Sequence, residues 1–94
     1  MSEHELINVI FKKEDMTLTL LLDIEKPFCE IADLVLKKFA INKMSEEPYF
    51  IYNAGNLDIN SNQPLKSFYL KNNSSIQVVI GAEVTGGKNL KKLF

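Results

Sequence analysis

The side chains that could do nucleophilic or metal chemistry are few in this chain of 94 residues. Its one cysteine, Cys29, falls near the start of an expected helix, where the helix dipole favours the reactive thiolate. The neighbouring Glu30 and Asp33 oppose that effect, and the one histidine, His4, lies in an expected disordered leader. His4 and the glutamates beside it form no preorganised metal site, because a floppy chain end does not hold ligands in place. We therefore expect neither a Cys/His nucleophile nor a metal site.

The remaining polar groups do not suggest catalysis either. Residues 14–15 and 46–47 are pairs of acidic side chains in turn-like segments, where they are most simply solvated charge. The adjacent glycines Gly86 and Gly87 are not followed by the helix signature of a phosphate-binding loop. No nucleophile, base and oxyanion donor can be assembled from the chain. The sequence thus predicts a protein that is not an enzyme and uses no cofactor.

The composition of the chain excludes some classes of binding partner and indicates the cellular compartment. The chain has 11 lysines, no arginine and 12 acidic residues, for a formal net charge of -1. Nucleic acid is not an expected partner, because its binders usually carry a basic excess on one face. No apolar run approaches the roughly 20 residues that span a bilayer, and residues 1–5 lack the positive region of a signal peptide. A lone cysteine indicates a reducing compartment, so we expect the protein in the cytoplasm or nucleus. We also expect a monomer that does not bind membranes.

Apolar residues alternate along two segments, 6–13 and 16–24, which predict two strands joined in an antiparallel hairpin. Pro27 fits the first turn of a helix, because its missing N–H costs nothing there. From this point to about Ala40, apolar residues gather on one helical face. That stripe comprises Phe28, Ile31, Ala32, Val35 and Phe39. Leu34 falls outside it, on the polar side.

The second half of the chain predicts two further strands. Residues 41–48 are a polar connection, 49–52 a third strand, and 75–80 a last strand that we expect between the first and the third. Residues 65–70 fit either a helical turn or an ordered loop. The element order predicts an α+β fold, with one helix packed on one face of a mixed sheet of four to five strands. We divide the chain into a disordered leader (1–5), one domain (6–80) and a flexible tail (81–94) that contains the two glycines.

Several of these segments match one known pattern in their order and spacing. Residues 50–57 read Phe-Ile-Tyr-Asn-Ala-Gly-Asn-Leu and resemble ubiquitin's Leu-Ile-Phe-Ala-Gly-Lys-Gln-Leu, with the glycine one place later. Residues 75–79 read Ser-Ile-Gln-Val-Val and resemble ubiquitin's Thr-Leu-His-Leu-Val. Over about residues 6–87 the chain resembles a ubiquitin-like β-grasp domain. This resemblance implies a role in protein–protein interaction, with ubiquitin-pathway proteins among the partners.

The resemblance places the family's hydrophobic recognition patch on Ile51 and Val79, with Gln77 where ubiquitin has its patch histidine. The residues themselves indicate the same surface, because strand alternation turns Ile51 away from Phe50, and Val79 away from Val78. A contiguous apolar patch on a solvated sheet face marks a partner site. The alternative is that these are single exposed apolar residues, which are common and need no function.

The first two expected strands carry outward-facing apolar residues as well. Ile10 and Leu21 either form a second apolar patch near Thr17 and Thr19, or cover each other as a cross-strand pair. The turn between these strands departs from the ubiquitin pattern. It lacks the leucine that flanks ubiquitin's patch and offers only Met16 in its place.

The resemblance also gives a meaning to Gly86 and Gly87. In modifiers of this family a protease cuts after the second glycine, and the new carboxylate is adenylated and then passed to thiols and a lysine amine. Glycine suits this chemistry, because a residue without a Cβ can thread a narrow enzyme channel. The preceding segment carries the acidic Glu83 and no arginine, unlike ubiquitin's tail. Two interpretations follow: a precursor processed after Gly87 and conjugated to lysines, or a flexible hinge that ends one domain of a longer chain.

Overall fold

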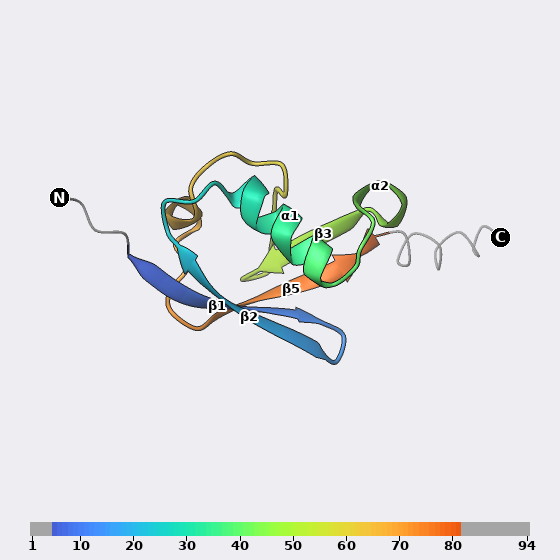
Figure 1. Ribbon diagram of the computed structural model, residues 1–94, viewed down its shortest axis with the longest axis horizontal. Coiled ribbons are helices and arrows are strands. Elements are labelled where there is room, and N and C mark those ends of the chain that lie inside the picture. The colour runs from blue at the N-terminus through green and yellow to red at the C-terminus, as the bar shows by residue number, and fades with distance from the viewer. Residues whose placement is uncertain (1–4, 82–94) are drawn as a thin grey trace.

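The computed structural model describes residues 5–81 as a five-stranded sheet with one main helix across one face (Figure 1). The elements are β1 (Leu6–Lys13), β2 (Met16–Asp23), α1 (Phe28–Lys38), α2 (Lys43–Glu46), β3 (Pro48–Tyr52), β4 (Gly55–Leu57), the 3-10 helix η1 (Leu65–Phe68) and β5 (Ser74–Ile80). The strand order is β2-β1-β5-β3-β4. The predicted α+β class, with a helix on one face of a mixed sheet, is confirmed.

The strands pair as their alternation predicts. β1 and β2 form an antiparallel hairpin in which Lys13 faces Met16, so the turn is only Glu14-Asp15. Glu14 has φ of 56°, the left-handed conformation that tight hairpin turns require. β5 is parallel to β1 and antiparallel to β3. The last strand therefore lies between the first and the third, as expected.

The N-terminus of α1 is capped by backbone from a distant loop. Pro27 is the N-cap residue and makes no side-chain capping bond. Phe28 N–H donates to the Gln63 carbonyl oxygen, and Cys29 N–H to that of Ser61, each at 2.8 Å. These two bonds satisfy amides that the first helical turn leaves without intrahelical partners. They also fix the loop before η1 against the helix.

The C-terminus of α1 comes at Lys38, earlier than the predicted end near Ala40. Ala40 has φ of 58°, which a right-handed helix cannot contain. Leu36 is buried although the predicted stripe omitted it, and Phe39, which the stripe included, is only partly buried. Leu34 is 37% exposed, in agreement with its place outside the stripe.

Aromatic rings join the layers of the core. The ring centroids of Phe11 and Phe28 each lie 5.9 Å from that of Phe50, and Phe28 lies 4.9 Å from Phe68. The four rings come from β1, α1, β3 and η1, so one cluster holds the sheet, the helix and the segment before β5 together. The Phe28–Phe50 pair is edge-to-face and the other two pairs are tilted, and aromatic pairs of this kind add to the stabilisation that burial provides.

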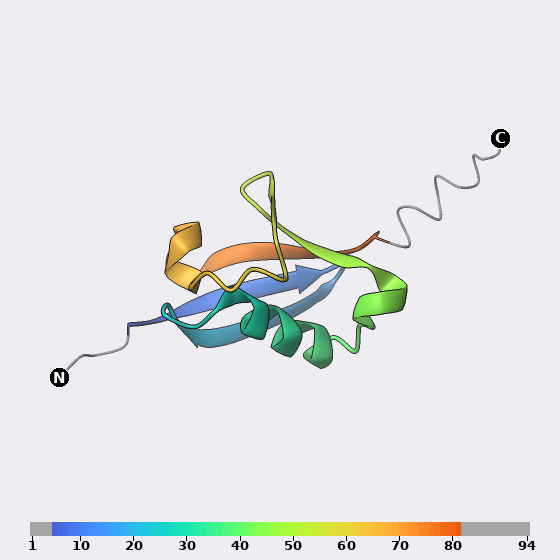
Figure 2. The ribbon, with the colours of Figure 1, turned by 90° about the horizontal axis from the view of Figure 1, so that it is seen from above.

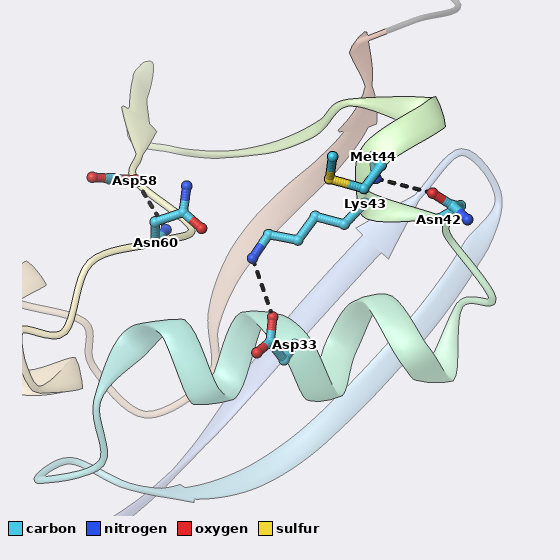
Figure 3. A network of polar contacts seen from close by, with 6 residues as sticks. All are labelled: Asp33, Asn42, Lys43, Met44, Asp58 and Asn60. Carbon is cyan, nitrogen blue, oxygen red and sulfur yellow. Dashed lines mark hydrogen bonds and ion pairs between the residues drawn. The ribbon is translucent and has the colours of Figure 1, made fainter.

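Residues 41–48, predicted to be a polar connection, contain the short helix α2. The Asn42 side-chain oxygen accepts hydrogen bonds from the backbone N–H groups of Met44 and Ser45, each at 2.9 Å. Figure 3 shows the bond from Met44. In return, Asn42 N–H donates to Glu46 Oε1 at 2.6 Å. Lys43 Nζ lies 3.5 Å from Asp33 Oδ1 and so ties α2 to α1. The polar residues of this segment thus cap and anchor a helical turn.

Backbone hydrogen bonds connect Glu5 and Gly81, the first and last described residues, to the rest of the fold. Ile24 N–H donates to the Glu5 carbonyl oxygen at 3.1 Å, and Gly81 N–H to that of Glu47 at 3.0 Å. The rest of the expected leader and tail lies outside the described residues. Between residues 5 and 81, no helix combines the length and the apolar character needed to cross a bilayer.

Candidate functional site

The sheet has one face under α1 and a second that α1 leaves uncovered, which we call the open face (Figures 1 and 2). Strand pairing sets the rows of side chains across it. Lys12 is paired with Gln77, and Gln77 with Ile51, so these three form one row over β1, β5 and β3. Val79 is paired with Tyr49 in the next row. Residues far apart in the sequence are thereby gathered on one surface.

We call Ile51, Gln77 and Val79 the Ile51 patch. Ile51 and Val79 are diagonal neighbours across the antiparallel β3–β5 pair, a position in which Cα atoms lie about 7–8 Å apart. Both are partly buried and Gln77 is exposed. Tyr49, directly opposite Val79, enlarges the apolar area and was missed in the sequence analysis. The signal was available, because the alternation that turns Ile51 outward also turns Tyr49 outward.

An open hollow of about 390 Å³ adjoins the Ile51 patch. Its lining is Lys12, Glu14, Ile51, Asn53, Ala54, Ser75 and Gln77. Asn53 and Ala54 have φ of 56° and 67°, so the tight turn between β3 and β4 forms one wall. Most of the lining is polar, which suits a polar or charged side chain of a partner at the margin of the apolar patch.

Lys12 places a positive charge on the open face near the hairpin end of β1, one strand away from Gln77. Its neighbour Lys13 lies 4.0 Å from Glu14 in an ion pair at the hairpin tip. Within residues 5–81, no ion pair or side-chain hydrogen bond engages the exposed Lys12 ammonium group. This amine can therefore bind an incoming carboxylate without first breaking an internal ion pair of the described fold.

A second apolar area lies at the β2 edge of the open face. We call Leu6, Ile10 and Leu21 the Leu21 cluster. Leu6 and Leu21 are 52% and 60% exposed, and Ile10 is partly buried. Leu21 is paired with Asn8, so Leu6 and Ile10 are its diagonal neighbours. Mutual cover by Ile10 and Leu21 does not account for such exposure, and the geometry favours the second-patch interpretation.

Among residues 5–81, the side chains that could act as nucleophiles or metal ligands are not brought together into a site. Cys29 is partly buried in the first turn of α1. In the part of the chain from Glu5 to Gly81, no group of three or more His, Cys, Asp and Glu side chains could hold a metal ion. His4, Gly86 and Gly87 lie outside the described residues.

Comparisons with protein-family models and with curated proteins found no match. Solved structures do match. The ubiquitin-like domain of an Arabidopsis thaliana protein has a TM-score of 0.68 at 16% identity, over 80% of this chain and 77% of that one. The ubiquitin-like domain of yeast Ddi1 has a TM-score of 0.67 at 17% identity, over 83% and 92%. A third structure, described by the words "Molecular Mimicry of SUMO promotes DNA repair", has a TM-score of 0.66 at 18% identity, over 83% of this chain and 95% of that one. Together with the sheet order and the single crossing helix, these likenesses show that the chain has the ubiquitin-like β-grasp fold.

Proposed function

We propose that this domain works by binding other proteins through the Ile51 patch, in the cytoplasm or nucleus, with ubiquitin-pathway proteins as the expected partners. The observation that carries the proposal is the register of β3 and β5, which makes Ile51 and Val79 neighbours beside Gln77 on the open face. Tyr49 widens the apolar area, and the hollow beside it has polar walls. An apolar centre with a polar margin is the usual anatomy of a protein interface. A patch of this size belongs to the weak, transient class.

The test compares the proteins captured by the full chain and by a double variant, Ile51→Ala with Val79→Ala. Capture is measured by mass spectrometry after crosslinking, because weak complexes do not survive washing. We expect the double variant to lose the specifically captured proteins and to keep its fold by circular dichroism. A matched control removes exposed apolar residues elsewhere, with Leu34→Ala and Met44→Ala, and should capture as the unchanged chain does. Equal capture by the Ile51/Val79 variant would move the interface to another surface.

A second proposal is that the chain is a modifier precursor. Gly81 is hydrogen-bonded to Glu47, and the six residues from there to Gly87 have a maximal extended length of about 20 Å. In this proposal water hydrolyses the Gly87–Lys88 bond, and ATP adenylates the new carboxylate with release of pyrophosphate. An enzyme thiol then displaces AMP to form a thioester, and a target lysine amine displaces the thiol to form an amide. The resemblance to ubiquitin and the adjacent Gly86-Gly87 support it, whereas the acidic Glu83 does not.

Intact mass measurement tests the modifier proposal. The full chain is incubated in a cell extract of its source with and without ATP. The proposal expects loss of residues 88–94 and adducts that form only with ATP, and both should disappear in Gly87→Ala. Persistence of the full-length mass under all conditions contradicts it and leaves the binding proposal unaffected.

A further inference from the structure

We propose that the open face docks one amphipathic helix of a partner, which buries apolar side chains on both the Ile51 patch and the Leu21 cluster and places a carboxylate against Lys12. This inference rests in part on the proposed function, because it includes the Ile51 patch. It adds a second contact area, the conformation of the bound segment and the charge that the segment must carry.

The exposure of the Leu21 cluster is the first argument. Leu21 and Leu6 are both more than half exposed, although each belongs to a strand of the sheet. The next residues in sequence, Ile7 and Leu22, point to the opposite face of the sheet and are buried. Large apolar side chains that stay exposed on adjacent strands form a contiguous patch, and such patches mark docking surfaces.

The spacing of the two areas is the second argument. From Leu21 on β2 to Ile51 on β3 there are three strand spacings, about 14 Å, and four residues along the strands, about 13 Å. The diagonal is therefore roughly 20 Å, which a helix of about 13 residues spans. A helix laid across a sheet face is also how sheets commonly bury apolar surface, as α1 does on the other side. One helix can thus reach both areas at once.

The charge between the two areas is the third argument. Lys12 is next to Gln77 in its row, and Ile10 is two residues before it on the same strand, so Lys12 lies between the patch and the cluster. Its ammonium group is exposed and has no ion-pair partner in the described fold. A carboxylate near the middle of the docked helix satisfies this charge, whereas an apolar residue there would bury it unpaired.

The position of Lys12 also argues against a second copy of this chain as the occupant. If two open faces packed against each other with the two-fold axis near Lys12, the two Lys12 ammonium groups would lie close together. Like charges that approach in an interface are repulsive and suppress that pairing. Glu14, the carboxylate of this chain that shares the hollow with Lys12, already lies in an ion pair with Lys13, so we assign the complementary charge to a different chain.

A peptide selection tests the proposal. A displayed library of helical peptides, randomised along one face, is selected against the full chain and separately against Lys12→Glu. We expect peptides from the unchanged chain to carry apolar residues at both ends of the face and Asp or Glu between them. Those from Lys12→Glu should carry Lys or Arg at the same central position. No binders, or no difference in the central charge, would overturn the inference.

Affinity measurements with one recovered peptide separate this inference from the proposed function. We expect Leu21→Ser and the Ile51/Val79 double alanine variant each to weaken binding about tenfold or more, and Leu34→Ala to leave it unchanged. Unchanged binding by Leu21→Ser overturns the two-area inference while the Ile51 patch stands. Unchanged binding by the double variant overturns both. Circular dichroism of each variant establishes that the fold is retained.

Discussion

At the scale of single residues, backbone conformation identifies a site of strain on the surface. Tyr69 follows η1 with φ of 60° and is 84% exposed, so a residue with a Cβ occupies a left-handed conformation without compensating burial. This conformation costs an L-residue about 1–2 kcal/mol. We expect Tyr69→Gly to raise the free energy of unfolding by about 0.5–1 kcal/mol, since glycine also gains freedom in the unfolded chain. Urea denaturation checks this, with Tyr69→Phe as a control that should change nothing.

Gly81 marks the opposite case, a residue that cannot be enlarged. A Cβ at this position would collide with the backbone carbonyl oxygen of Glu47, to which Gly81 N–H is bonded. We expect Gly81→Ala to lower the free energy of unfolding by about 1–3 kcal/mol, as overpacking does. Gly55 is the matched control, because a Cβ there meets its nearest atom, the Tyr52 carbonyl oxygen, at an ordinary 3.7 Å. Equal stability of both alanine variants, measured by denaturation, would contradict the argument.

At the scale of elements, the N-terminal turn of α1 connects the helix to β3, to η1 and to the loop before η1. Phe28 is fully buried between the rings of Phe50 and Phe68, and its N–H is bonded to the loop before η1. We expect Phe28→Ala to lower the free energy of unfolding by about 3–5 kcal/mol. Leu34→Ala, on the exposed side of the same helix, should change it by no more than about 0.5 kcal/mol. Chemical denaturation measures both variants, and equal denaturation midpoints for Phe28→Ala and Leu34→Ala would contradict this prediction.

The elements also show how far sequence patterns reach. Strands with several alternating residues, such as 6–13 and 75–80, were predicted because burial on one face imposes a period of two. α2 was missed because four residues are too few for an apolar stripe. Its one signal was Asn42 with an acidic side chain four positions later. β4 was missed for the same reason, as a strand of three residues has no measurable period.

The candidate site needed both alternation and register. Alternation sufficed to place Ile51 and Val79 on one side of the sheet. Whether Ile10 covers Leu21 depends on the pairing of β1 with β2, which the length of the hairpin turn decides. Because a turn longer by one residue shifts every pair, the sequence alone left two interpretations open. The two-residue turn makes Ile10 and Leu21 diagonal neighbours and leaves Leu21 exposed.

At the scale of the whole molecule, the open face carries two apolar areas with Lys12 between them, and this charge should keep copies of the chain apart. We expect Lys12→Leu to join the Leu21 cluster and the Ile51 patch into one apolar surface and to cause self-association as concentration rises. Analytical ultracentrifugation over a concentration series measures this self-association. Lys66→Leu is the control with the same loss of charge, since Lys66 lies on η1 in an ion pair with Glu25 at 3.0 Å, and it should sediment as the unchanged chain does. Sedimentation of Lys12→Leu identical to that of Lys66→Leu at every concentration would show that Lys12 does not govern association through this face.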